Sequence, residues 1–356
     1  VEEVRSVQPT SFSIGSLGFA SLKIYKNNKV DVGFYKTADD LTETVFQKTI
    51  MTPDAYTKKF NEVNQATTQA SVYPQEATEK SKTYKFLFGE HYRSIYGTKV
   101  EVPVANLTTL NGGLKPLISG GGNQSLSLRL EDKEGKQYVM RGLRKSSKQF
   151  LQSAIFKNTY IEDKLEDTYV LDFIDDYYTT SHPFTPFIIG QMSDAIGLYH
   201  TNPKLYYVPK QNALGKYNET YGDELYMIEE RPHKSQRNVA SLGNGEDIIS
   251  TQELLVNLEK DEKHHVDAQM YLRARIFDFL IGDWDRHSDQ WRWVAQENNE
   301  TVLYQPIARD RDQAFAKIDG NLLSLLNRLN PLRHMQNFDE KYAKPRWITK
   351  SAFPLD

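Results

Sequence analysis

Cysteine is absent from the 356-residue chain, which excludes disulfides, thiolate metal sites and cysteine nucleophiles. Long apolar stretches are missing too, because no run approaches the roughly 18 to 20 residues that span a bilayer. No charged-then-apolar signal segment opens the sequence. We therefore expect a soluble protein with no transmembrane segment. The first residue is Val1, so we also expect an upstream piece that was removed and that could include an export signal.

A surplus of one charge is lacking as well. The 44 Lys and Arg residues nearly balance the 47 Asp and Glu residues, and the two signs are interspersed along the chain. Such a chain has no long-range positive field for nucleic acid, so we expect no nucleic-acid partner. What the sequence does contain is 39% hydrophobic and 12% aromatic residues. That content is enough for packed cores in about two domains.

Alternating apolar and polar residues predict several strands. The first two flank the turn-like segment 26–29 and indicate a β-hairpin within residues 11–35. From Val266 to Ile281 the apolar residues instead recur at helical spacing. The further predicted strands are 125–130, 137–143, 205–208 and 224–232.

The polar segment 50–82 contains two prolines and is typical of a linker. We therefore expect a small β-rich segment over residues 1–70. A sheet-based α+β unit with a glycine-rich loop would cover 71–232, and a helical unit with the acidic motifs would cover 233–356.

A glycine-rich loop, Gly120, Gly121, Gly122 and Asn123, precedes the predicted strand 125–130. Glycine has no Cβ and reaches unusual backbone angles, so such a loop can let backbone N–H groups approach phosphates. An ordinary hairpin loop is the alternative.

The next predicted strand carries Arg141, with Lys145 nearby. This is the spacing at which kinase-like folds bring a basic side chain from a strand to nucleotide phosphates. A surface arginine is the alternative interpretation.

The predicted helix leads directly into an acidic loop. In this loop Asp285 is followed by Arg286 and His287, a combination suited to a base that orients a hydroxyl beside cations that limit repulsion from phosphate. A few positions later, Asp289 or Gln290 offers an oxygen ligand of the kind that Mg²⁺ or Mn²⁺ prefers. A structural Asp–Arg–His network under tryptophans is an equally weighted alternative.

A second acidic segment has Asp310 and Asp312 at alternate positions. In a strand both carboxylates would face the same side, and two like-facing carboxylates need a cation. Arg309 and Arg311 would point to the opposite side. We therefore expect either a metal ion or an arginine from elsewhere in the chain as the partner.

The order of these parts is glycine loop, basic strand, apolar strand ending at Glu229, helix, Asp loop and Asp-x-Asp segment. This is the order found in phosphoryl-transfer enzymes of the kinase type. The segments 285–287 and 310–315 resemble those of atypical kinases, namely the spore-coat CotH family, the secretory-pathway casein kinases and, more distantly, the HipA toxin kinases.

A closer resemblance covers roughly residues 89 to 320. It links the chain to an uncharacterised bacterial envelope module that often follows a calcineurin-like phosphoesterase domain. The segments that carry this resemblance are 89–93, 112–116, 120–130, 200–203, 282–287 and 309–313.

The resemblance implies roles for individual residues. Asp285 matches the catalytic Asp, Gln290 or Asp289 the metal-binding Asn position, and Asp310 the metal-binding Asp. Arg141 stands where these kinases have the nucleotide-binding Lys. Further implied positions are Asp194 as a candidate acidic partner of the basic strand, and Lys145, Glu229 and the glycine loop 120–123 as nucleotide contacts.

We therefore expect an α+β, kinase-like two-lobed fold, with a β-rich N-lobe and a helical C-lobe, preceded by the small β-rich segment. The expected activity is phosphotransfer from ATP with Mg²⁺ or Mn²⁺ to a protein or small-molecule acceptor, with Asp312 as a further metal ligand. The resemblance also implies a periplasmic or cell-surface location. Alternatives are a catalytically impaired kinase-like scaffold that serves a phosphoesterase, and a metal-dependent hydrolase.

Overall fold

The computed structural model describes residues 18–24, 29–38, 41–51, 59–120, 124–151, 169–298, 300–326, 334–341 and 350–352. Within them, helices and several sheets mix along the chain, so the fold is α+β. No helix in these ranges is both long and apolar enough to cross a membrane.

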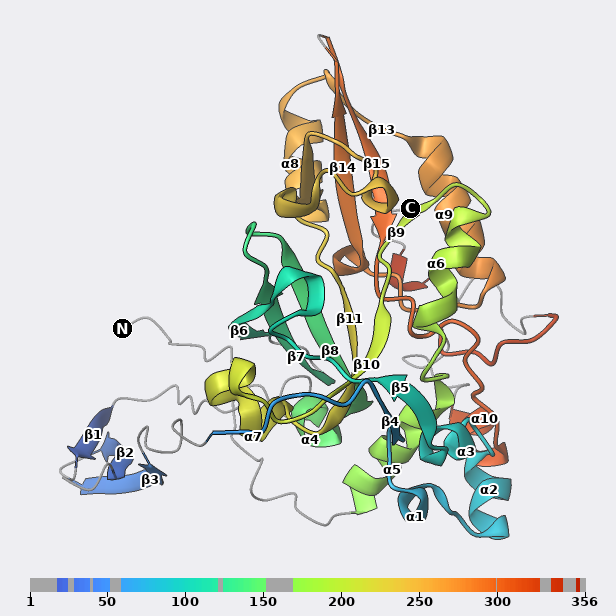
Figure 1. The fold of residues 1–356 in the computed structure, drawn as a ribbon. Helices are drawn as coiled ribbons and strands as arrows, with labels where there is room; N and C mark the ends of the chain where they lie inside the picture. Colours follow the sequence, from blue (N-terminus) through green and yellow to red (C-terminus); the bar gives the residue numbers. More distant parts are fainter. Residues whose placement is uncertain are drawn as a thin grey trace.

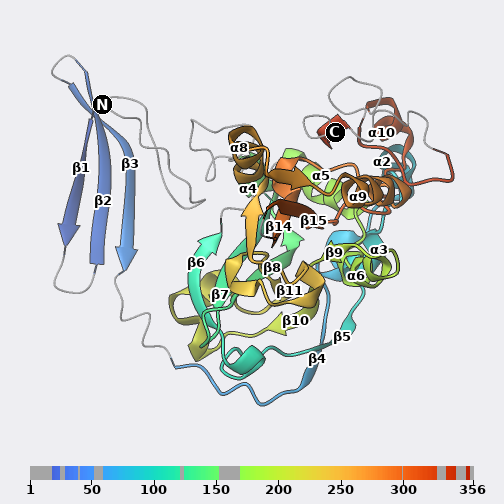
Figure 2. The same cartoon turned by 90° about the horizontal axis from the view of Figure 1, so that it is seen from above.

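The N-terminal strands form an antiparallel sheet of their own. Strands β1 (Gly18–Ile24), β2 (Lys29–Ala38) and β3 (Leu41–Met51) lie in that order. The β1–β2 pair confirms the predicted hairpin. This sheet stands apart from the other sheets in Figure 1 and Figure 2.

A five-stranded antiparallel sheet follows, with the order β10-β11-β8-β7-β6. It confirms the four strands predicted from alternation. Side chains at alternate positions, such as Leu128, Met140 and Ile228, fill a buried core on one face. The opposite face is apolar at Leu143 and Met227 and carries the cations Arg141 and Lys145 of β8. Its strands are β6 (Lys115–Gly120), β7 (Ser125–Glu131), β8 (Gln137–Lys145), β10 (Lys204–Val208) and β11 (Glu224–Glu230).

The C-terminal unit, expected to be helical, also contains a second sheet. Its strands are β12 (Asp247–Ser250), β13 (His264–Val266), β14 (Trp291–Glu297) and β15 (Val302–Ala308), with β9 (Tyr199–His200) parallel to β15. Side chains of β14 are buried on both faces, since Trp293 and Val294 belong to different cores. Polar and apolar residues therefore do not alternate, and the pattern used to find strands is lost.

Three helices pack on this sheet: α6 (Pro186–Asp194), α8 (Thr251–Lys260) and α9 (Ala268–Leu280). Figure 1 shows α8 and α9 on either side of β14 and β15. The helix predicted over 266–281 is confirmed as α9. Ile189 and Leu198 also lie in this core, so the domain boundary expected at residue 232 is crossed by an earlier part of the chain.

The boundary expected at residue 70 is crossed too. Strand β4 (Thr67–Ala70) pairs with β5 (Val100–Pro103), so it belongs to the second unit. The helices around this pair are α1 (Gln75–Thr78), α2 (Lys82–Phe88) and α3 (Arg93–Gly97), and those elsewhere are α4 (Ser147–Phe150), α5 (Tyr169–Tyr177), α7 (Asn218–Tyr221) and α10 (Asn321–Leu326).

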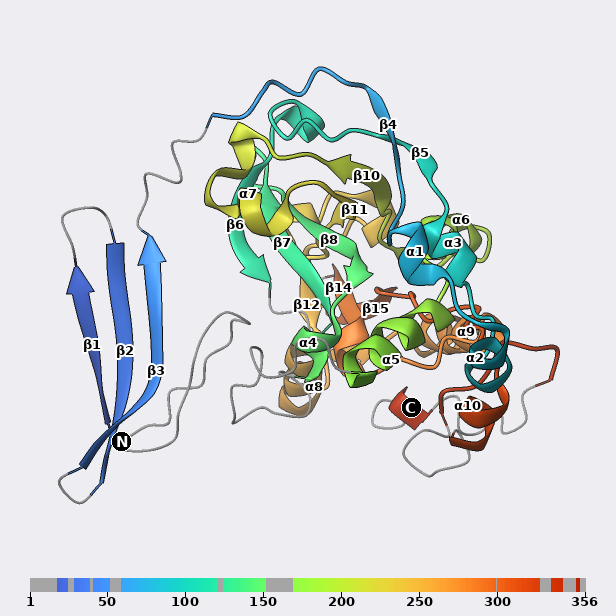
Figure 3. The same cartoon turned by 90° about the horizontal axis from the view of Figure 1, so that it is seen from below.

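Two distant parts of the chain are fastened together beside α2 and α10, which lie side by side in Figure 3. The Asp319 carboxylate accepts hydrogen bonds from the backbone N–H groups of Glu90 and His91, each at 3.0 Å, and contacts the His91 ring at 2.7 Å. Asn321 donates to the Phe86 carbonyl at 3.1 Å. We call this the 90–319 clasp.

Candidate functional site

The loop after α9 brings Asp285 to a partly exposed position. Gly282 follows the helix at φ 71°, a left-handed conformation that glycine adopts without a Cβ clash. The backbone N–H of Asp283 then donates to the Asp278 carbonyl at 2.9 Å and closes the turn. Two residues on, the Asp285 side chain is 32% exposed.

A buried ionic network holds this loop. The Asp278 carboxylate accepts from Arg275 at 3.0 Å and from Arg311 at 2.9 Å, and it lies 3.3 Å from the guanidinium of Arg286. Arg286 also meets Asp283 at 3.5 Å. Buried charges are costly when unpaired, so these five side chains depend on one another.

The catalytic role predicted for Arg286 does not fit this position. The side chain is only 1% exposed, and it lies 4.7 Å from the ring centre of Trp291. It donates to the backbone carbonyls of Arg309 at 2.7 Å and Gln290 at 3.3 Å. Arg286 therefore holds the two acidic segments together, which is the structural alternative.

The strand geometry predicted for the second acidic segment is wrong, because β15 ends at Ala308. Asp310 has a φ of 53°, which Asp tolerates better than most side chains, and the chain turns there. Both carboxylates nevertheless meet β8. Asp310 lies 2.5 Å from Arg141, and Asp312 accepts from Lys145 at 2.7 Å. The cation from elsewhere in the chain is thus observed.

Arg309 and Arg311 were both expected to point away from the Asp310 and Asp312 carboxylates, and the structure places Arg311 in this way. Arg311 points away from these carboxylates into the buried network. The backbone N–H of Arg309 donates to the Gln290 carbonyl at 3.0 Å. Burial lowers the pKa of the Arg309 guanidinium to about 10, and the nearby charges of Arg292 and Arg141 contribute to that shift.

The pKa values of the acidic side chains differ. Burial raises the pKa of Asp285, and the charges of Asp312 and Asp310 raise it further, whereas His287, 3.9 Å away, lowers it. Burial alone would also raise the pKa of Asp310, but Arg141 beside it lowers that pKa to about 2. Asp285 is therefore the better proton acceptor.

We call the five side chains that meet here the junction site: Arg141, Lys145, Asp285, Asp310 and Asp312. Two cations come from β8, and three carboxylates come from the loops after α9 and β15. The cations of β8 pair with Asp310 and Asp312, whereas Asp285 has only the His287 ring at 3.9 Å as an ion-pair partner in the described part of the chain. Such a site can bind phosphate and accept a proton.

The predicted metal-binding positions differ in exposure. Gln290 is buried, with its amide nitrogen 3.4 Å from the His287 ring. Asp289 is exposed, and its backbone N–H donates to the other His287 ring nitrogen at 3.3 Å. Over the described ranges, no group of three His, Asp or Glu side chains is arranged to hold a metal ion.

The glycine loop is described only at its two ends. A Cβ on Gly120 would collide with the Ser127 hydroxyl, so glycine is needed there for close strand packing. The predicted phosphate contacts Gly121, Gly122 and Asn123 lie outside the described residues. Gln124, which follows them, accepts from Lys145 at 3.5 Å. The loop therefore returns next to the junction site.

Two further predicted positions have other surroundings. Glu229 is buried, and burial raises its pKa while the charge of Arg141 opposes that shift. Asp194 does not pair with the basic strand as expected. Its carboxylate meets the His200 ring at 2.9 Å, because α6 packs on the C-terminal sheet.

Sequence reasoning missed the neutral contacts that join the two units. The Ser181 hydroxyl donates to the Gln313 side chain at 2.8 Å, and Tyr92 donates to the Phe315 carbonyl at 2.7 Å. No motif surrounds these residues, so only the fold brings them together.

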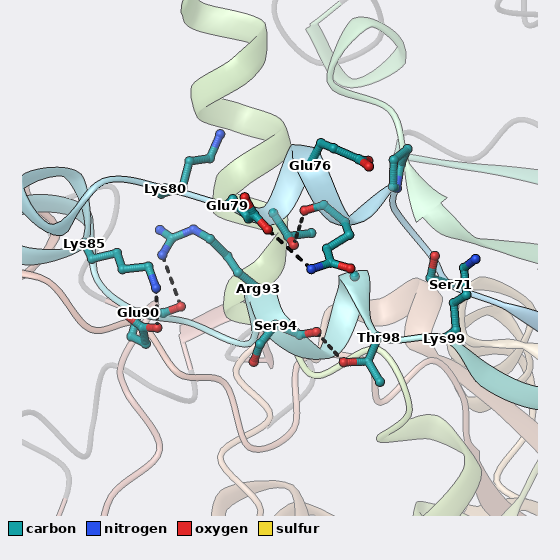
Figure 4. Close-up of a pocket in the computed structure, with 14 residues that line it drawn as sticks. Ser71, Glu76, Glu79, Lys80, Lys85, Glu90, Arg93, Ser94, Thr98 and Lys99 are labelled. Atoms are coloured by element: carbon teal, nitrogen blue, oxygen red, sulfur yellow. Dashed lines mark hydrogen bonds and ion pairs between the residues drawn. The ribbon is translucent and has the colours of Figure 1, made fainter.

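A further cavity lies away from the junction site. Its volume is about 1030 Å³, and it is open to solvent between the 75–80 and 85–99 segments (Figure 4). Lys85 pairs with Glu90 at 2.8 Å at its edge. None of the predicted site residues lines it.

We interpret the site from its geometry alone, because comparisons with known proteins give no match. No protein-family model, curated protein or solved structure matches the chain.

Proposed function

We propose that the chain is an atypical kinase-like phosphotransferase that uses ATP and a divalent metal ion at the junction site. The proposal includes a two-lobed arrangement in which the five-stranded β6–β11 sheet is one lobe and the C-terminal unit is the other. One observation carries it. Two cations of β8 pair with Asp310 and Asp312 after β15, and Asp285 after α9 lies close enough for both carboxylates to raise its pKa.

In this proposal Asp285 orients the acceptor hydroxyl and takes its proton. The new oxygen–phosphorus bond forms as the bond to the departing ADP oxygen breaks. The raised pKa of Asp285 makes its carboxylate a stronger base than an ordinary surface Asp. Arg141 and Lys145 hold phosphate oxygens, and the planar guanidinium of Arg141 can do so with two parallel hydrogen bonds.

A bound Mg²⁺ or Mn²⁺ would offset the negative charge of the transferred group. The donor set fits such an ion, because Asp310 and Asp312 supply oxygen ligands and Mg²⁺ often takes one or two carboxylates with phosphates and water. The buried amide of Gln290 is the further candidate donor. Since the described residues contain no three-ligand group, the phosphates would have to complete the set.

A thermal-shift titration with ATP, with and without Mn²⁺, tests the proposal. We expect the midpoint of unfolding to rise with ATP and Mn²⁺ together, since a ligand that binds only the folded state stabilises it. Asp310→Asn should remove the metal-dependent part of the rise. Asp285→Asn should keep it and lose turnover. No rise in the wild-type protein under either condition would contradict the proposal.

A second candidate is a catalytically impaired kinase-like scaffold. It is favoured by the ion pairs themselves, because Asp310 and Asp312 already neutralise Arg141 and Lys145. In this version the module belongs to the bacterial envelope and serves a calcineurin-like phosphoesterase, as the sequence resemblance implies. It predicts binding to such a domain, measured by analytical ultracentrifugation, with no phosphate transfer and no change on Asp285→Asn.

A further inference from the structure

A group of arginines lies beside the junction site, on strands of both sheets or directly after them. On the β6–β11 sheet, Arg129 pairs across from Val139, and the backbone N–H of Arg231 donates to the Gln137 carbonyl at 3.0 Å. Residues 137, 139 and 141 alternate along β8, so this is the face that carries Arg141.

The C-terminal sheet contributes two more arginines. Arg292 pairs across from Ile307, and Arg309 pairs with the backbone of Gln290. The backbone bond from Arg309 to Gln290 continues the β14–β15 register one residue beyond β15, so Arg292 and Arg309 lie on one face.

These four arginines differ from the others near the site, because none of them forms an ion pair within the described ranges. Arg231 donates to the side-chain amide of Gln137 at 2.9 Å. Arg292 donates to the backbone carbonyls of Asp289 and Trp291 at 3.2 and 2.6 Å. Their guanidinium groups therefore keep donors that no carboxylate occupies.

The four cations are close enough to repel one another. Burial lowers the pKa of Arg231, and the charges of Arg129 and Arg309 lower it further. Burial lowers the pKa of Arg292 and the charge of Arg231 lowers it too, whereas Asp289 and Glu253 oppose that shift. Gathering like charges on two sheet faces costs folding energy, and a bound anion would remove that cost.

We propose that Arg129, Arg231, Arg292 and Arg309 form a binding site for the phosphate groups of a small ligand. Guanidinium groups match phosphate oxygens with paired hydrogen bonds. This site excludes Asp285 and the other carboxylates of the junction site, so it goes beyond the proposed transfer reaction and does not require it. The phosphate belongs either to the nucleotide or to a second phosphorylated molecule.

Isothermal titration calorimetry with sodium tripolyphosphate, in metal-free buffer, tests the site in the whole chain. We expect the wild-type protein to bind and Arg309→Gln to weaken binding about 10- to 100-fold, the range for hydrogen bonds to charged groups. Arg237→Gln is the matched control, since Arg237 is exposed on a nearby loop and its loss changes the net charge equally. Arg129→Gln is a second test on an exposed strand position.

Thermal unfolding separates binding from folding. Arg309→Gln should keep or raise the midpoint of thermal unfolding, because it removes a charge that repels its neighbours. Weaker tripolyphosphate binding with an unchanged midpoint would support the proposal. Tripolyphosphate binding by the wild-type protein, whether or not phosphate transfer is detected, separates this site from the proposed reaction. ATP that competes with tripolyphosphate would assign the site to the nucleotide, and ATP that binds alongside it would assign a second ligand. No binding by the wild type, or equal weakening by Arg237→Gln, would overturn the proposal.

Discussion

The C-terminal unit contains two groups of ionised side chains that differ in the origin of their cations. In the buried network, Asp278 is paired with arginines of the same unit. In the junction site, Asp310 and Asp312 are paired with Arg141 and Lys145 of the other sheet. The first group cannot exchange partners without unfolding its surroundings. The second can exchange them for a ligand, which is the property that a binding site needs.

Substitution of Asp278 in the buried network should cause the largest loss of unfolding free energy. Asp278→Asn leaves three buried guanidinium groups around a neutral amide, and breaking a buried pair in this way costs about 3–5 kcal/mol. Asp312→Asn is the matched control and should cost about 1 kcal/mol or less, because its side chain is 26% exposed. Urea denaturation measures both, and similar losses would erase the distinction between the two groups.

Asp285→Asn should instead reduce activity and leave stability intact. Loss of a general base lowers turnover by about 10²- to 10⁴-fold. The folded-state pKa of Asp285 is raised, so its ionised form opposes folding at pH 7 and a neutral amide should not lower the free energy of unfolding. Phosphate-transfer assays and denaturation of the same samples test this pair of results. A variant that is active, or one that is unstable, contradicts the prediction.

Asp310 should stabilise the fold in a pH-dependent way. Its pKa falls from an ordinary 3.8 to about 2, and each pKa unit corresponds to about 1.4 kcal/mol. A lowered carboxyl pKa stabilises the folded state above the unfolded pKa. The contribution of roughly 2 kcal/mol should therefore be complete above about pH 4 and disappear as the pH falls toward 2. The difference in unfolding free energy between wild type and Asp310→Asn, followed from pH 6 downward, should shrink over that interval. A constant difference would contradict it.

The last prediction concerns the neutral hydrogen bond between Ser181 and Gln313, where we expect only a small loss of stability. Ser181→Ala removes the hydrogen bond to Gln313 and should cost about 1 kcal/mol. Phosphate transfer should change little, because neither side chain belongs to the junction site. Thermal unfolding with a parallel activity assay measures both quantities, and a large loss of activity would give this contact a functional role.

Much of the fold follows from the sequence where one face of an element is buried and the other is not. Residues 125–130 and 137–143 alternate because one face packs in a core and the other carries mostly polar residues, such as Arg129 and Arg141. Strand β14 was missed, since Trp293 and Val294 are both buried on opposite faces. The alternation of apolar and polar residues predicts a strand with one buried and one exposed face, but it does not detect a strand that is buried on both faces.

The candidate site was predictable by residue type and only in part by orientation. Asp285, Asp310 and Asp312 stood out as clustered carboxylates, but nothing in the sequence distinguishes Arg286, which is buried, from Arg141, which reaches the junction. The reason is tertiary. The left-handed φ of Asp310 turns the chain out of the strand, so local alternation no longer decides where its side chain points.

The 90–319 clasp sets the order in which the chain can complete its fold. Asp319 satisfies the backbone of Glu90 and His91 across more than two hundred intervening residues. During synthesis the 89–93 segment is made early, and its partner emerges only after both sheets have been translated. The β6–β11 sheet can therefore form first, whereas the junction site reaches its final geometry only after residues 310–319 have left the ribosome.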